Sequence, residues 1–275
     1  MAESRWPLSR LDRLNNKNFD HRLEQELARA KGDSMHSAFL GEFLGTMIMI
    51  LLGNGVVANV VLRETKGEKS GWIVITTGWC FAVMAGVFTA LAIGSDGHLN
   101  PAVTVGVAVS TGDWSRLGVY VPAQFLGAMA GAALVWLTYL SHWQKTPEPL
   151  DKLGCFSTIP AIRAPLANIL TEVIGTFVLV LVAAAISSKY GTGVGLSPGL
   201  GPFLVGFLVW GIGLSLGGPT GYAINPARDL GPRVMHAVLP IPGKGTSDFG
   251  YAYVPVIGPL VGAGLAGVLV KMIGI

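Results

Sequence analysis

The tripeptide Asn-Pro-Ala occurs twice in the chain, at Asn100-Pro101-Ala102 and at Asn225-Pro226-Ala227. Asparagine is a preferred N-cap and proline loses no hydrogen bond at the first helical position, so each copy predicts a helix start. Apolar residues continue to Thr111 after the first copy and to about Val238 after the second. At ~1.5 Å per residue, helices of this length cross roughly half of a ~30 Å hydrocarbon core. The repeated motif therefore predicts two half-helices that enter a bilayer without crossing it.

Composition places the chain in a membrane. Of 275 residues, 51% are hydrophobic and 13% are charged, whereas soluble domains carry about 25% charged residues. The net charge of +3 is modest and indicates no nucleic-acid partner. We expect an all-α integral membrane protein, with the lipid bilayer as its partner. Its apolar runs predict six transmembrane helices, at about 36–61, 71–94, 115–141, 167–187, 200–218 and 252–273.

The two halves of the chain repeat one another. Glu42, in Glu-Phe-Leu-Gly-Thr of the first run, corresponds to Glu172, in Glu-Val-Ile-Gly-Thr of the fourth, and each half has its own Asn-Pro-Ala. Each repeat holds three full spans, so the second enters the membrane with opposite polarity. The predicted organisation is a polar N-terminal extension at 1–34 without a part in permeation, and a channel domain at 35–275. The channel domain divides into a first repeat at 35–150 and a second, inverted repeat at 165–275.

The third and sixth runs also match in sequence. Tyr120-Val-Pro with Gly127 and Gly131 corresponds to Tyr253-Val-Pro with Gly258 and Gly262. Small residues four positions apart let transmembrane helices pack closely. The match predicts equivalent helix contacts in the two halves.

An inverted repeat brings the two half-helix starts together near the membrane midplane. Each start carries roughly half a positive charge from its dipole, so a facing pair repels cations. Irregular backbone at this depth is tolerated where it lines a watery cavity. Asn100 and Asn225 can donate to a solute, and a ladder of unpaired carbonyls can accept from it. The predicted ladder consists of Gly97, His98, Leu99, Tyr222, Ala223 and Ile224.

The segments around both motifs resemble those of the aquaporins, or major intrinsic proteins. Gly97-His-Leu-Asn-Pro-Ala-Val-Thr and Gly221-Tyr-Ala-Ile-Asn-Pro-Ala-Arg-Asp carry the resemblance, which covers about 36–275. The glycerol-facilitator subfamily is indicated by Asp229, Arg233, Tyr139, Pro259-Leu260 and the phrase Phe156-Ser-Thr-Ile-Pro160. The resemblance implies the aquaporin fold and a homotetramer with one pore in each subunit. It also implies a multi-pass protein of the cell membrane, plasma or inner, with cytoplasmic termini.

The resemblance further implies a selectivity filter. Arg228 would supply donors and positive charge, and Tyr222, where the subfamily typically has phenylalanine, an aromatic wall. Water-specific members place a histidine at the position of Gly213, so this glycine indicates a wide constriction. The contributor from the second span is Trp79, or Gly78 if the alignment is anchored on Met84. An arginine at membrane depth is by default functional, although snorkelling to the surface is the alternative.

Three polar residues at membrane depth have more than one interpretation. Glu42 and Glu172 could relay protons, as membrane carboxylates do in transporters. The resemblance instead implies structural support, in which both accept hydrogen bonds from the segments before the half-helices. Asp229 is predicted to be a supporting residue as well. His98 is predicted to form structural hydrogen bonds, with a pH-operated gate as the alternative.

The predicted function is a passive channel for glycerol and other small neutral solutes, with water and with urea as a further candidate, that excludes protons and ions. A channel chiefly for water or another neutral solute, or a proton-coupled secondary transporter, are the alternatives. An enzyme is not expected, because no Ser/His/Asp grouping or metal-ligand cluster appears near the spans. No cofactor or metal is predicted. Cys80 and Cys155 lack any metal-site or disulfide spacing and are interpreted as free packing thiols.

Overall fold

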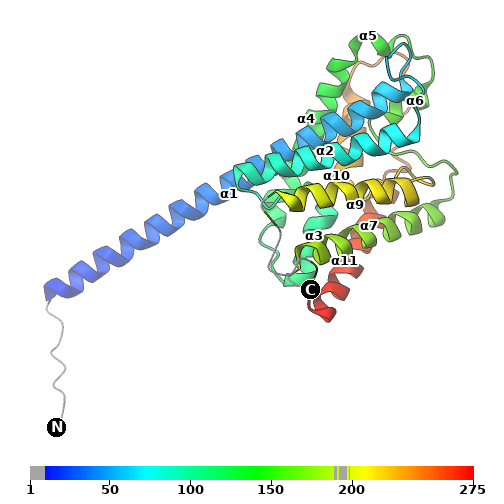
Figure 1. Ribbon diagram of the computed structural model, residues 1–275. Helices are drawn as coiled ribbons and strands as arrows, with labels where there is room; N and C mark the ends of the chain where they lie inside the picture. Colours follow the sequence, from blue (N-terminus) through cyan, green and yellow to red (C-terminus); the bar gives the residue numbers. More distant parts are fainter. Residues whose placement is uncertain (1–9, 189–190, 192–196, 198) are drawn as a thin grey trace.

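The computed structural model describes residues 10–188, 191, 197 and 199–275, with side chains from residue 36 onward. In these residues the regular structure is helical (Figure 1), which confirms the predicted all-α class. The helices are α1 (Arg10–Val61), α2 (Trp72–Ile93), α3 (Pro101–Thr111), α4 (Leu117–Thr138), α5 (Leu140–Trp143), α6 (Pro149–Gly154), α7 (Pro165–Ser187), α9 (Leu200–Leu216), α10 (Pro226–Val238) and α11 (Val254–Ile273).

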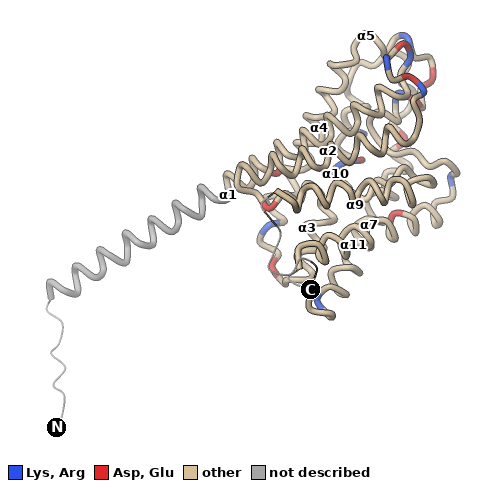
Figure 2. Tube along the Cα trace, in the orientation of Figure 1, with Lys and Arg blue, Asp and Glu red and all other residues tan. Residues whose placement is uncertain are grey.

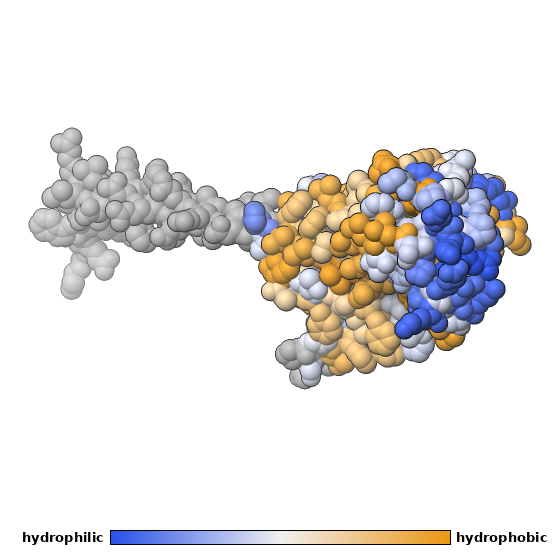
Figure 3. Space-filling model, turned by 90° about the horizontal axis from the view of Figure 1, so that it is seen from above, coloured by the Kyte–Doolittle hydropathy of each residue, from blue (hydrophilic) through white to orange (hydrophobic). Residues whose placement is uncertain are grey.

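Five helical segments are long and apolar enough to cross a membrane: His36–Val61, Trp72–Ile93, Leu117–Thr138, Pro165–Ser187 and Val254–Ile273. The remaining predicted span is α9, an apolar helix of 17 residues that measures ~26 Å at ~1.5 Å per residue. This length lies at the short end of the range for a transmembrane helix. Charged residues gather mainly at the helix ends (Figure 2), and an apolar surface covers the body of the bundle (Figure 3). The chain is therefore an integral membrane protein.

The two half-helices end where the sequence predicts. A Cβ on Gly267 of α11 would lie 2.5 Å from the Gly106 carbonyl oxygen, so α3 packs along the C-terminal part of α11. Near the other end of α11, Arg233 of α10 donates through Nη1 to the carbonyl of Ser247 at 2.9 Å, in the loop before that helix. The half-helices thus run toward opposite ends of the bundle, as an inverted repeat requires.

Glycines set the close helix contacts in both halves. A Cβ on Gly127 would lie 2.3 Å from the Phe43 carbonyl oxygen, and one on Gly262 would lie 2.3 Å from the Val173 carbonyl oxygen. Phe43 and Val173 each follow the buried glutamate of their own half. Gly262 is therefore the counterpart of Gly127. The sequence match pairs Gly127 with Gly258 instead, and this pairing is wrong by about one helical turn. The contacts with the neighbouring helix decide which glycines are equivalent.

Two smaller predictions concern the cysteines and the N-terminus. Cys80 and Cys155 are both free and buried, which confirms that they are packing thiols. Burial raises the pKa of Cys155 well above its ordinary value, so this group stays a thiol. The predicted extension at 1–34 lies partly outside the described residues. Helix α1 begins at Arg10 and continues across the predicted boundary, so the extent of the extension and its lack of a role in permeation stay predictions.

Two glycines of α11 provide a test of the close packing. Replacing Gly262 with alanine places a methyl group against the backbone of α7, whereas nothing lies within 4 Å of a Cβ on Gly264. We expect Gly262→Ala to destabilise the protein by about 1–3 kcal/mol and Gly264→Ala to have almost no effect. Thermal unfolding of the two variants in detergent measures the difference. Equal melting temperatures would contradict the packing described.

Candidate functional site

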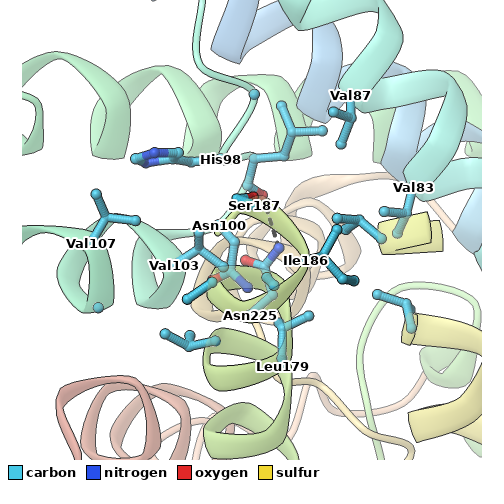
Figure 4. A pocket seen from close by; sticks show the side chains of 18 of the residues that line it. Val83, Val87, His98, Asn100, Val103, Val107, Leu179, Ile186, Ser187 and Asn225 are labelled. Carbon is cyan, nitrogen blue, oxygen red and sulfur yellow. Dashed lines mark hydrogen bonds between the residues drawn. The ribbon is translucent and has the colours of Figure 1, made fainter. Parts of the chain in front are cut away.

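A cavity of about 560 Å³ lies between the two halves of the bundle. One part of its wall is polar and comes from residues 96–100, residues 222–225 and Arg228. The remaining wall is largely aliphatic and includes Val83, Val87, Leu179, Val205 and Val209. Figure 4 shows Asn100 and Asn225 close together beside this wall. The cavity is therefore amphipathic, with hydrogen-bonding groups along one part and hydrocarbon along the rest.

Asn100 and Asn225 each connect the two halves. Each side-chain oxygen caps its own helix: Asn100 Oδ1 accepts from Ala102 N at 2.8 Å, and Asn225 Oδ1 accepts from Ala227 N at 3.0 Å. Each side-chain nitrogen donates to the opposite half: Asn100 Nδ2 to the Ile224 carbonyl at 2.7 Å, and Asn225 Nδ2 to the Leu99 carbonyl at 2.8 Å. Because an amide nitrogen carries two hydrogens, one on each asparagine is left for a solute.

These contacts correct part of the predicted carbonyl ladder. The Leu99 and Ile224 carbonyls are not unpaired, because each accepts from the asparagine of the other half. A single sequence repeat gives no sign of such a crossed pairing. The four other carbonyls, those of Gly97, His98, Tyr222 and Ala223, accept no hydrogen bond from any residue that the structure describes. They belong to the segments that line the cavity.

Glu42 and Glu172 are fully buried and hold these two segments. Glu42 accepts from the backbone nitrogens of His98 at 2.8 Å and Leu99 at 2.7 Å. Glu172 accepts from the backbone nitrogen of Ala223 at 3.0 Å and from that of Ile224 at 2.8 Å. The two carboxylates therefore accept equivalent backbone hydrogen bonds in the two halves, which supports a structural role for both.

Three further polar residues complete these networks and were missed in the sequence. Ser95 Oγ and Thr220 Oγ1 donate to Glu42 and Glu172, at 2.6 and 2.7 Å. Both hydroxyls precede their asparagine by the same interval, so the internal repeat contained the signal. Gln124 Nε2 also donates to Glu42 at 2.7 Å. A lone amide within an apolar span is itself a signal of function or of internal hydrogen bonding.

Trp79, Tyr222 and Arg228 all line the cavity. The Arg228 guanidinium carbon is 4.3 Å from the centre of the Trp79 ring, which is a close cation–π contact. Gly53 makes room for Trp79, since a Cβ there would lie 2.4 Å from the ring. The alternative residue Gly78 instead faces Val56 of α1, 2.6 Å from a Cβ placed on it. Of the two alternatives, Trp79 is the one that lines the cavity.

Gly213 does not line the cavity. A Cβ at this position would lie 2.8 Å from Tyr222 Cζ, because the tyrosine ring fills the space beside the glycine. The expectation that Gly213 leaves a wide constriction stays a prediction. An aromatic residue from another segment occupies the space, and sequence spacing does not reveal this contact.

The Asp229 carboxylate binds Arg233 and the loop before α7. Its carboxylate accepts from Arg233 Nε at 2.8 Å and from the backbone nitrogen of Thr158 at 2.8 Å. Asp229 is therefore a supporting residue and forms no ion pair with its neighbour Arg228. Within the described part of the chain, Arg228 has no carboxylate partner, and its Nη1 has no hydrogen-bond acceptor. An unpaired positive charge thus faces the cavity.

His98 lines the cavity and makes two contacts that fix its ring. Nδ1 lies 3.1 Å from Thr104 Oγ1, and the ring meets Tyr120 edge-on at a centroid distance of 5.0 Å. These contacts support the structural interpretation, and the gate stays a prediction. Among the residues that the structure describes, no three His, Cys, Asp or Glu side chains form a cluster that could hold a metal ion.

Comparisons with known proteins agree with this architecture. The family model described as "Major intrinsic protein" matches residues 29–270. A probable glycerol uptake facilitator protein of Thermotoga maritima is 56% identical over 227 residues, which cover 82% of this chain and 94% of the relative. A glycerol uptake facilitator protein of Streptococcus pneumoniae is 53% identical, covering 84% and 97%. The solved aquaglyceroporin from Plasmodium falciparum is 30% identical with a TM-score of 0.76, covering 86% of this chain and 96% of that one.

Glu172→Gln tests whether a buried carboxylate stabilises the backbone segment before its half-helix. The amide keeps the shape but presents an N–H where a backbone N–H needs an acceptor, and an unsatisfied buried donor costs about 1–3 kcal/mol. We expect a lower melting temperature in detergent. Glu64→Gln is the control, since that side chain is 66% exposed at the surface. If the two variants have the same melting temperature, the Glu172 carboxylate does not stabilise the backbone segment before α10.

Proposed function

Because the chain belongs to the major intrinsic protein family, we propose that it is a passive membrane channel that conducts glycerol. Two bacterial relatives above 50% identity over more than four fifths of the chain carry the name glycerol uptake facilitator, and the structural neighbour is an aquaglyceroporin. The protein is therefore a channel and not an enzyme.

The amphipathic cavity is the observation that best supports glycerol as the solute. Glycerol can turn its hydroxyls to one side and its carbon chain to the other. Polar groups at Asn100, Asn225 and Arg228 match the hydroxyls, and Val83, Leu179 and Val209 match the carbon chain. Exchange of water for these groups keeps every hydroxyl hydrogen-bonded and so lowers the cost of desolvation.

Exclusion of cations follows from the charges at the cavity. Two helix starts meet at Asn100 and Asn225, and each contributes a partial positive charge. Arg228 adds a full charge that no carboxylate of the described residues neutralises. Neutral solutes cross this field without an electrostatic barrier, so water and urea are further proposed permeants.

Proton-coupled transport has less support than passive conduction. A relay through Glu42 or Glu172 would need carboxylate oxygens that are free to take up protons. Both carboxylates instead accept hydrogen bonds from the backbone at both oxygens. Protonation would break the contacts that hold the cavity wall, so the glutamates favour a fixed pore.

We also propose the assembly and location that the family resemblance implies. The protein would form a homotetramer in the cell membrane, plasma or inner, with one pore in each subunit. Exposed aromatic residues of α2 and α9, including Phe81, Phe88, Phe203 and Phe207, leave an apolar surface for lipid or for neighbouring subunits. An even number of spans, with α9 included, places both ends of the channel domain on one side, which we propose is cytoplasmic.

Stopped-flow light scattering on proteoliposomes tests the function. We expect gradients of glycerol, urea and water to relax faster than in protein-free liposomes, with glycerol flux that rises linearly with its gradient. If water passes and glycerol does not, the protein is a water channel. Saturation of the flux together with dependence on a proton gradient would instead indicate a transporter.

The unpaired charge is tested by Arg228→Met, which keeps an unbranched side chain and removes the charge. A unit charge at 4 Å contributes about 4 kcal/mol at an effective dielectric constant of about 20. We therefore expect leakage of Na⁺ or H⁺ to increase at least about tenfold. Arg163→Met is the matched control, since Arg163 is exposed and paired with Asp248. Unchanged leakage in Arg228→Met would show that this charge does not exclude cations.

A further inference from the structure

Two side chains of α10 hold one short segment of the loop at 239–253, which follows this helix. Arg233 Nη1 donates to the carbonyl of Ser247 at 2.9 Å and to that of Asp248 at 3.1 Å. His236 lies three residues further along α10, and its Nδ1 is 2.8 Å from Ser247 Oγ. Both α10 side chains are fully buried. The loop is therefore closed against the helix, and one of its attachments is a histidine, a residue that ordinarily titrates between pH 5 and 8.

The surroundings of the His236 ring disfavour its protonated form. The Phe156 ring meets it edge-on at a centroid distance of 5.4 Å. The Nε2 atom is buried and has no hydrogen-bond partner among the residues that the structure describes. A neutral ring can leave this nitrogen without a hydrogen, whereas a protonated ring carries a hydrogen on both nitrogens. Protonation in the closed loop would therefore bury an N–H donor without an acceptor, which is unfavourable.

The charged groups around His236 act in the same direction. Burial, with Lys244 and Arg233 as neighbouring positive charges, lowers the pKa of His236 to about 4. Lys244 lies at the end of α10, where its Nζ donates to two backbone carbonyls at 2.6 and 2.7 Å. The carboxylates of this helix and this loop are those of Asp229, paired with Arg233, and Asp248, paired with an arginine of the segment before α7. Neither carboxylate is thus left to stabilise a protonated His236.

The difference between the closed and the open loop makes closure depend on pH. In an open loop His236 would have the ordinary pKa of histidine, about 6.5. The closed loop therefore favours the neutral ring, and this contribution to closure is fully present above about pH 6.5. It is lost progressively as the pH falls toward about 4, because the open loop then takes up a proton that the closed loop excludes. From pH 7 to pH 5 the equilibrium constant for opening should rise about 20-fold.

We propose that His236 is an acid-sensitive latch on the loop at 239–253. At neutral pH the uncharged ring holds Ser247, and protonation in an acidic medium releases the loop. Release would also remove two acceptors from Arg233, which holds the Asp229 carboxylate at the start of α10. In the orientation proposed above, this loop faces the outside of the cell. The latch therefore makes the support of the second half-helix respond to the external pH.

Amide hydrogen exchange of the full-length protein in detergent, measured from pH 7 to pH 5, tests the latch. After correction for the intrinsic pH dependence of exchange, opening of the segment around Ser247 should rise about 20-fold, while α4 stays protected. His236→Asn keeps a polar group beside Ser247 but cannot take up the proton, so its loop should lose almost all of this response. His142→Asn is the matched control and should respond like the wild type, because Nδ1 of His142 contacts a different loop, at the Arg63 carbonyl.

Any other result would overturn the latch. A loop that does not respond to pH in the wild type, or that responds equally in His236→Asn, is not controlled by this histidine. Loss of the response in His142→Asn would assign it to the other loop, and equal opening of α4 would mean that acid unfolds the whole bundle. If His236→Asn does not fold, the wild-type profile still decides, since an absent response contradicts the proposal. The measurement uses no solute, so its result is independent of the proposed glycerol conduction.

Discussion

The structure depends on hydrogen bonds from irregular backbone to two buried carboxylates. A half-helix leaves its approach segment at membrane depth, where water cannot satisfy the backbone nitrogens. Glu42 and Glu172 accept from two such nitrogens each, and Ser95 and Thr220 add a hydroxyl donor. With the nitrogens bound behind the segment, several carbonyls stay available on the cavity wall. In each segment the backbone nitrogens therefore bind the carboxylate, and carbonyls of the same residues line the cavity.

Symmetry and asymmetry have separate roles along this cavity. The centre is symmetric, because each asparagine caps its own helix and donates to the other half. Another part of the lining is asymmetric, since Trp79, Tyr222 and Arg228 come from different segments of the chain. Asp229 is bound by Arg233 and Thr158, which leaves Arg228 unpaired. The centre fixes the architecture, and the asymmetric part carries the unpaired charge of Arg228.

Local signals in the sequence predicted most of the fold. The caps at Asn100 and Asn225 and the lengths of the apolar runs located both half-helices and the spans, because these features depend on neighbouring residues. The resemblance implied that the paired glutamates accept hydrogen bonds from the segments before the half-helices, and both carboxylates accept such bonds. Contacts between distant segments were not predictable in the same way. The crossed bonds to Leu99 and Ile224, the ring of Tyr222 beside Gly213, and the counterpart of Gly127 all depend on how helices pack. A lone Gln124 was a usable signal that the sequence interpretation left out.

The crossed bonds of Asn100 and Asn225 also bear on how such a chain folds and how it arose. Each half leaves one carbonyl and one amide group that only the other half satisfies. The centre of the pore is therefore complete only when both halves are in place. A half-length ancestor would have had to pair with a second copy inserted upside down in order to complete the same bonds. Fusion of two such copies into one chain would turn a concentration-dependent encounter into an intramolecular one.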